Sequence, residues 1–405
     1  MAERRRVDDR CSAALAVGPA AAGSSSGGWL DRPQTGEHVL EVLSGLRPVE
    51  AAAWAALHPE AADLLERVPP AVVAAWWRSL DDTSGQASPS ATQLLLLAGA
   101  PGLLGALDGL PPGARVRANA VAAGRRLERL TARLRRLEGE DDAVWSAVRD
   151  ELELERDYLR RVVGADPELQ LYVYDPAHHR VVEMIGSAGA APSHVITYVP
   201  GTFSDLEGFW SGDTQQVARR LVGEAPTGES AVAFVWKDGV FPAEKSPVNR
   251  DEMAYFMEAN DEPRAEPVGR DLARFREGLG VHLPASTYSA LGHSWGTAAV
   301  TSAEVHGAHW DHVLSLSGAG VPEGWHRAEG TTYRDFSYFD GLQVAQKLRQ
   351  VWHGRNPRAG DRFYHGEYYA PPSGVPDLLS DHALIAQDVP ENDQALKDMA
   401  REIYS

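Results

Sequence analysis

The stretch YSALGHSWGTAAVTSAEV, Tyr288–Val305, places Ser294 between Gly292 and Gly296. Before the motif GHSWG, the segment STYSAL is apolar and β-prone enough for a buried strand. After the motif, TAAVTSAEV favours a helix. In a nucleophile elbow, G-x-S-x-G joins a strand to a helix, and the glycines let the backbone turn sharply beneath the exposed serine. The alternative is a serine in an ordinary Gly-rich turn. The strand and helix on either side favour the elbow.

Composition limits the possible functions. The chain has 405 residues, 43% of them hydrophobic, and a formal net charge of −18. This charge opposes general binding to nucleic acids or anionic membranes, so we expect a soluble protein with a neutral or cationic substrate. The single cysteine, Cys11, cannot form an internal disulfide or build a cysteine metal site.

The N-terminus and the absence of long apolar runs bear on localisation. No run approaches the 18 residues that a transmembrane helix needs. Basic residues followed by SAALAVGPAAA faintly resemble a secretory signal, but Asp8, Asp9 and Arg10 interrupt the pattern. We expect a cytoplasmic protein.

The chain divides into three parts by composition and hydrophobic pattern. Residues 1–35 are rich in Ala, Gly and Ser and are expected to be a disordered tail. Residues 36–165 show helical patterns, including an apolar stripe of Leu127, Leu130, Leu134 and Leu137, and predict a helical bundle. Strands then alternate with helices over 166–405.

This third part predicts an α/β domain. LQLYVYD and RVVEMIG, joined by PAHH, indicate a β-hairpin, and HVITYVPG and SAVAFVW indicate buried strands. Alternating strands and helices predict a mostly parallel sheet with helices on both faces. The long, charged segment 237–268 is a candidate lid.

A serine nucleophile needs a histidine base oriented by a carboxylate, and in α/β-hydrolases the chain order is Ser, acid, His. Asp340 ends the run YRDFSYFDG, where a strand-end acid should lie. Asp335 lies inside that run, where a charge is expected to be paired or at an edge. Asp361, at the start of the last strand, is the other alternative.

For the base, His382 in LLSDHALIAQD is expected in the loop beyond the last strand, just before a helix. His365 lies within that strand and His353 in a turn, which favours structural roles for both. His293 directly precedes Ser294, so its side chain should diverge from the serine and pack or hydrogen-bond nearby.

The oxyanion of the reaction needs two backbone N–H groups. One is expected from Trp295, the residue after the nucleophile. The other is expected from YVPGTFSD, where Gly201, Thr202 and Phe203 follow a predicted strand. An ordinary Pro-Gly turn is the alternative.

Two other groups of residues have a functional and a structural interpretation. Five aromatic residues follow strand ends and either line an apolar acyl pocket or belong to the core: Phe203, Phe209, Trp210, Trp236 and Phe241. His306, His309 and His312 are spaced three apart, but side chains six residues apart diverge on a helix, so no metal site is expected. We predict no metal or organic cofactor.

With these residues in place, the chain resembles a bacterial family of α/β-hydrolases catalogued as a domain of unknown function. The likeness covers roughly residues 40 to 390. It rests on VAAWWRSL, GLLGALDGLPPGARVRANAVA, YVPGT, GHSWGT, HGRNP and His382, in this order. The resemblance implies Ser294 as nucleophile, Asp340 as acid and His382 as base, with a helical region accompanying the hydrolase domain.

The sequence thus predicts a serine hydrolase of the α/β-hydrolase fold, acting on a small-molecule or lipid-like carboxylic ester through an acyl-enzyme. Amide or thioester hydrolysis by the same triad is an alternative, because one scaffold hosts several reactions. A binding or scaffold protein with a vestigial pocket is the alternative of a different class.

Overall fold

The structure, a computed structural model, describes residues 32–81, 89–137, 139, 143–164, 167–189, 191–244, 258–370 and 380–405. Most of the predicted tail and the middle of the candidate lid, residues 1–31 and 245–257, lie outside this range. Within it, no helix has the length and apolar character needed to cross a membrane.

An eight-stranded sheet forms the centre of the molecule, with the order β1-β2-β4-β3-β5-β6-β7-β8. The strands are β1 (Gln170–Asp175), β2 (Arg180–Gly186), β3 (His194–Val199), β4 (Ala231–Asp238), β5 (Thr287–His293), β6 (His312–Leu316), β7 (Thr332–Phe336) and β8 (Tyr364–His365). β2 pairs antiparallel with β1 and β4, and the remaining pairs are parallel. This is the α/β-hydrolase fold, entered through the predicted hairpin.

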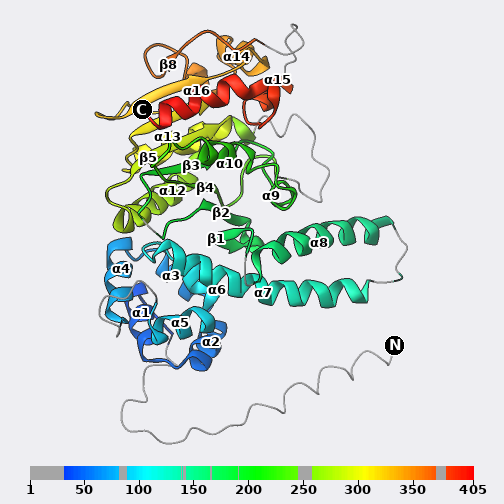
Figure 1. The fold of residues 1–405 in the computed structure, drawn as a ribbon, viewed down its shortest axis with the longest axis vertical. Helices are drawn as coiled ribbons and strands as arrows, with labels where there is room; N and C mark the ends of the chain where they lie inside the picture. Colours follow the sequence, from blue (N-terminus) through cyan, green and yellow to red (C-terminus); the bar gives the residue numbers. More distant parts are fainter. Residues whose placement is uncertain are drawn as a thin grey trace, which may run out of the picture.

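Helices cover both faces of the sheet, as predicted (Figure 1). On one face α12 (Glu262–His282) and α13 (Trp295–Val305) share an apolar cluster with the strands. On the other, α8 (Ala143–Val162), α9 (Leu206–Ser211), α10 (Gln216–Gly223) and α16 (Asp393–Ile403) share a second cluster. Every residue of β3 and β4 is buried, which explains their largely apolar sequences.

A helical region precedes the sheet. It comprises α1 (Gly36–Gly45), α2 (Pro48–Leu57), α3 (Ala61–Leu65), α4 (Pro70–Ser79), α5 (Ala91–Gly99), α6 (Pro101–Gly105) and α7 (Pro112–Arg136), followed by α8. Proline opens α2, α4, α6 and α7, where its missing N–H has no intrahelical partner to lose. Helices α1 to α6 and the start of α7 enclose a third apolar cluster.

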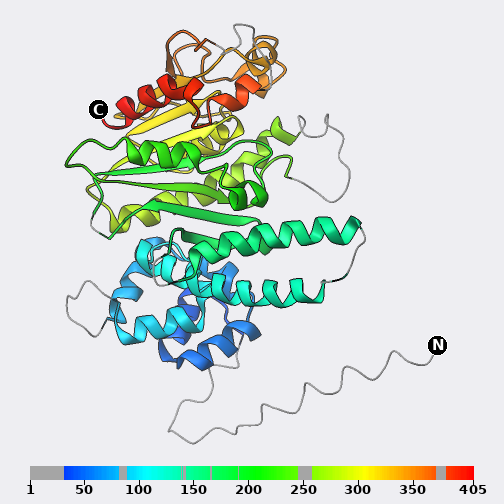
Figure 2. The same ribbon diagram turned by 45° about the vertical axis from the view of Figure 1, so that its right-hand side comes forward.

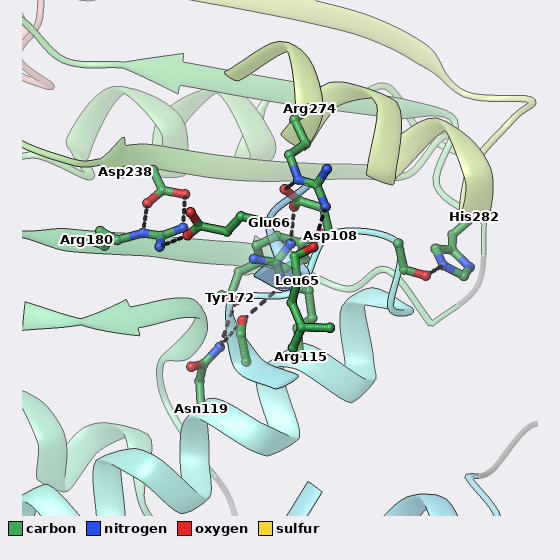
Figure 3. A network of polar contacts seen from close by, with 12 residues as sticks. Leu65, Glu66, Asp108, Arg115, Asn119, Tyr172, Arg180, Asp238, Arg274 and His282 are labelled. Carbon is green, nitrogen blue, oxygen red and sulfur yellow. Dashed lines mark hydrogen bonds and ion pairs between the residues drawn. The ribbon is translucent and has the colours of Figure 1, made fainter. Parts of the chain in front are cut away.

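The seam between the helical region and the sheet is polar (Figure 3). Asn119 of α7 donates to the Tyr172 carbonyl at 2.7 Å. The buried Arg115 guanidinium pairs with Asp108 at 2.5 Å, and Arg274 of α12 lies 3.3 Å from the same carboxylate. Helices of the first region are therefore tied to both β1 and α12.

Helix α8 is more closely integrated with the sheet than its sequence suggested. Together with α7 it forms a long helical pair beside β1 (Figure 2). Its Tyr158 donates to the buried Glu183 of β2 at 2.9 Å, and its Leu159 belongs to the sheet's own apolar cluster. The domain boundary predicted near residue 165 stays a prediction.

Candidate active site

Ser294 stands at a sharp turn between β5 and α13, the predicted place. Its backbone has φ 52° and ψ −120°, a conformation that costs an L-residue on the order of 1–3 kcal/mol. The Ser294 N–H donates to the Leu316 carbonyl at 2.9 Å, and its own carbonyl accepts from Thr297 and Ala319 at 3.2 and 2.9 Å. These bonds hold the strained residue at the carboxyl end of β5.

The backbone around Gly292 and Gly296 leaves no room for a side chain at either position. A Cβ on Gly292 would lie 2.4 Å from the Thr297 nitrogen, and one on Gly296 would lie 2.2 Å from the Val199 carbonyl oxygen. Because both contacts are with backbone atoms, a side chain could be admitted only by moving β3 or α13. The motif is thus an elbow and not an incidental Gly-rich turn.

Asp340 and His382, predicted as acid and base, are brought together. The Asp340 carboxylate is fully buried and caps α14 (Gly341–Lys347), accepting from the Leu342 N–H at 2.7 Å through Oδ1. Its Oδ2 lies 2.9 Å from Nδ1 of His382. Since a carboxylate accepts, Nδ1 carries the proton, and Nε2 is the nitrogen that can accept a proton from a nucleophile.

The other candidate acids have different surroundings. Asp335, inside β7, accepts from the hydroxyls of Ser315 and Ser337 at 2.7 Å each and pairs with Arg358 at 2.9 Å. It is the paired strand residue that its position predicted. Asp361 is exposed.

His382 differs from its prediction in one respect. It lies within a short helix, α15 (Ser380–Leu384), and not in the loop before one. Of the other histidines, His365 is exposed on the edge strand β8 and His353 has a left-handed backbone, φ 53°, in a turn.

His293 links the elbow to the segment that carries His382. Its Nε2 lies 3.1 Å from the His382 carbonyl oxygen, and the centroids of the two rings are 5.2 Å apart. A carbonyl only accepts, so Nε2 bears the proton. Burial, reinforced by the nearby His382, lowers the pKa of His293 to about 3 and keeps the ring neutral. The hydrogen bond predicted for this residue is present.

The loop after β3 lies against the elbow. A Cβ on Gly201 would approach the Ser294 Cβ to 2.8 Å, so only glycine allows this close contact. Trp295 begins α13, and its backbone N–H adjoins the nucleophile. The Phe203 N–H, however, donates to the Pro242 carbonyl at 3.0 Å. It is therefore not an oxyanion donor, and Gly201 and Thr202 are the candidates left in this loop.

Of the two roles expected for the strand-end aromatics, pocket lining and core packing, the structure favours the core for most. Four of the five are core side chains with at most 5% of their surface exposed: Phe209, Trp210, Trp236 and Phe241. They fill the space between sheet and helices, and no sequence pattern separates this role from a pocket lining. Only Phe203, 59% exposed, is available to a substrate.

The three spaced histidines fall in different elements. His306 caps α13, His309 lies in the following turn, and His312 begins β6 near Glu402. Across the described ranges, no three His, Cys, Asp or Glu side chains gather as metal ligands would.

The described start of the candidate lid, residues 239–244, also belongs to this edge of the sheet. Residues 239–244 follow β4 and contact the 201–203 loop through Pro242, whose carbonyl accepts from the Phe203 N–H. The available signal was Lys237, which with Asp238 places two charged residues at the end of a strand that is otherwise apolar. Its partner Glu244 lies beyond the strand, so the pairing could not be inferred from a local pattern.

The comparisons with known proteins found matches among solved structures. No family model and no curated protein matches the chain. The resemblance to a catalogued bacterial family therefore stays a prediction.

Several solved hydrolases are distantly similar. Thermogutta terrifontis esterase 2, phosphorylated by paraoxon, shares 12% identity over 58% of this chain and 91% of its own, with a TM-score of 0.34. A dienelactone hydrolase-like promiscuous phosphotriesterase, P91, from metagenomic libraries shares 14% over 57% and 94%, with a TM-score of 0.30. An alpha-beta serine hydrolase homologue from Coxiella burnetii shares 13% over 58% and 95%, with a TM-score of 0.29. These values are too low to support an argument about activity, and the fold assignment rests on the strand order.

Proposed function

We propose that this protein is a serine hydrolase that cleaves carboxylic esters through an acyl-enzyme on Ser294. The observation that carries the proposal is the hydrogen bond between His382 Nδ1 and the buried Asp340 carboxylate. It leaves Nε2 as the proton acceptor, and the His382 backbone is joined to the residue preceding the elbow. A serine hydroxyl is a weak nucleophile until such a base is present.

In the proposed reaction, His382 Nε2 takes the proton from Ser294 Oγ as Oγ bonds to the ester carbonyl carbon. The tetrahedral intermediate collapses, the bond to the leaving oxygen breaks, and His382 returns the proton to the departing alcohol. Water then attacks the acyl-enzyme with the same base and releases the acid. Asp340 holds the imidazole in the tautomer that this sequence needs and stabilises its charged form.

Two backbone donors support the intermediate's negative charge. The Trp295 N–H is one, and its position at the start of α13 adds the favourable end of the helix dipole. The second comes from Gly201 or Thr202. A neutral ester suits the site better than an anionic one, because the chain carries a net charge of −18.

The test compares hydrolysis of p-nitrophenyl acetate, butyrate and octanoate by the wild-type chain and by Ser294→Ala. We expect kcat/KM to fall at least about 10³-fold, since the nucleophile is lost. Ser211→Ala, which removes an exposed hydroxyl on α9, is the matched control and should leave the rate unchanged. Equal rates for wild type and Ser294→Ala would overturn the proposal.

Parallel assays with p-nitroanilides and acyl thioesters separate the alternative hydrolases. A preference for either would keep the triad and change the substrate class. No turnover of any of the three classes would favour the binding or scaffold alternative.

A further inference from the structure

The loop 239–244 contacts both backbone segments that carry the candidate oxyanion donors. Its Pro242 carbonyl accepts the Phe203 N–H at 3.0 Å, which fixes the end of the 201–203 loop. Its Phe241 ring packs against the Trp295 indole, with centroids 5.1 Å apart and both side chains fully buried. A displacement of this loop would therefore shift both donors relative to Ser294.

The backbone of this loop is not self-supporting. Gly239 has φ 117° and Ala243 has φ 58°, so a non-glycine residue occupies the left-handed region. That conformation is unfavourable for alanine and persists only where surrounding contacts impose it. One such contact is the Ala243 N–H, which donates to Glu258 Oε2 at 2.9 Å.

Lys237 and Glu244 supply the strongest constraint. The Lys237 side chain is fully buried, and its Nζ donates to the carbonyls of His179 and Gly239, each at 2.8 Å. The same ammonium forms an ion pair with Glu244, whose exposure is 6%. One cation is thus bonded to both the first and the last residue of the loop.

Burying the charged pair Lys237–Glu244 costs desolvation free energy. Burial lowers the pKa of Lys237 and raises the pKa of Glu244, which means that desolvation opposes both charges. Apolar side chains of similar volume are often as stable as a buried ion pair, or more so. Stability alone does not account for the two charges, whereas a requirement for fixed loop geometry does.

We propose that Lys237 and Glu244 are positioning residues that set the oxyanion loop of the candidate active site. They act through Pro242 on Phe203 and through Phe241 on Trp295, and do not touch the substrate. This inference rests on the proposed function, because it assigns the pair a role in the same reaction.

The experiment measures how fast a fluorophosphonate probe modifies Ser294 in the full chain, together with kcat and KM for p-nitrophenyl butyrate. Removal of a whole oxyanion donor costs about 10²–10³ in kcat, so misplacement by Lys237→Met or Glu244→Gln should cost about 10- to 100-fold. We expect the labelling rate and kcat to fall together while KM changes less than about twofold. A purely structural pair would lower only the melting temperature.

Asp108→Asn is the matched control. It disrupts another buried ion pair, at the seam with Arg115 and Arg274 (Figure 3), without touching the 239–244 loop. It should reduce stability and leave the labelling rate of the folded protein unchanged. If Asp108→Asn slows labelling as much as Lys237→Met does, the effect is general and the inference fails.

A lone buried charge can prevent folding, so the double variant Lys237→Met/Glu244→Leu is included. It leaves neither Lys237 nor Glu244 as a lone buried charge, and His179, which loses its 3.2 Å contact with Glu244, is 45% exposed to solvent. The variant should therefore fold, yet it lacks the bonds to both ends of the loop. Slow labelling of this folded variant is the expected result. Wild-type labelling and kcat in the double variant would overturn the inference and leave the proposed function intact, whereas failure of the wild-type chain to label would overturn both.

Discussion

Two aspartates five residues apart show that the same type of side chain can have different roles in different surroundings. Asp335, within β7, and Asp340, just after it, are both buried, with 6% and 0% of their surface exposed. Asp335 pairs with Arg358 and accepts from two serine hydroxyls. Asp340 accepts backbone N–H groups at the start of α14, among them that of Leu342, and faces His382.

The difference lies in the partners and not in burial. Arginine stays protonated throughout the accessible pH range, so its pair with Asp335 can only hold structure. A neutral imidazole has a nitrogen that can accept a proton, so the pair of His382 with Asp340 can support proton transfer. A buried carboxylate becomes a candidate catalytic acid through the group that it orients.

The largest expected effect separates the two aspartates by activity. Asp340→Asn should lower kcat about 10⁴-fold, because an amide cannot hold His382 in the required tautomer. Asp335→Asn should change kcat less than about threefold in folded protein. Steady-state hydrolysis of p-nitrophenyl butyrate measures both, and comparable losses in the two variants would remove the distinction.

For stability the order should be reversed, with Asp335 the more important of the two aspartates. Asp335→Leu leaves the Arg358 cation buried without its partner and should destabilise the fold by about 3–5 kcal/mol. Adding Arg358→Met should recover most of that loss. Urea denaturation followed by circular dichroism gives the free energies of unfolding; no recovery in the double variant would mean that the pair is not the cause.

His293 tests how the base is held. His293→Phe keeps a ring but loses the donor to the His382 carbonyl, and should lower kcat about tenfold while KM is nearly unchanged. His293→Gln retains an N–H donor and should recover part of the rate. Identical kinetics for both variants would mean that the hydrogen bond does not position His382.

The last prediction concerns pH. Folded His293 stays neutral down to a pKa of about 3, whereas the unfolded side chain binds a proton below about 6.5. The unfolded state therefore takes up more protons, and stability should fall by about 1.4 kcal/mol per unit as pH drops from 6.5 toward 3. His293→Gln should remove this share of the slope in denaturation series across that range, and an unaltered slope would contradict the assignment.

The parts of the site that follow local patterns were predictable from the sequence. The elbow required only an apolar strand, two glycines and a helix, all contiguous around Ser294. Asp340 could be preferred over Asp335 because it ends its run, where a strand's carboxyl edge faces a site. His382 could be chosen by chain order, although the five-residue α15 around it carries no helical periodicity to detect.

The parts that depend on distant contacts were not predictable. Four strand-end aromatics are core, because their surroundings come from helices far along the chain. The Phe203 N–H is bound by Pro242, nearly forty residues later, which no pattern near Phe203 reveals. The contacts of Tyr158 and Leu159 of α8 with the sheet are of the same kind, because their partners lie on strands later in the chain.

The most direct test of the central claim is mass spectrometry of the full chain after reaction with a fluorophosphonate. The account predicts a single adduct on the peptide containing Ser294, absent from Ser294→Ala, formed far more slowly in His382→Ala and lost when the protein is unfolded in urea. No adduct on Ser294 in the folded wild-type chain, or labelling that survives unfolding, would contradict it.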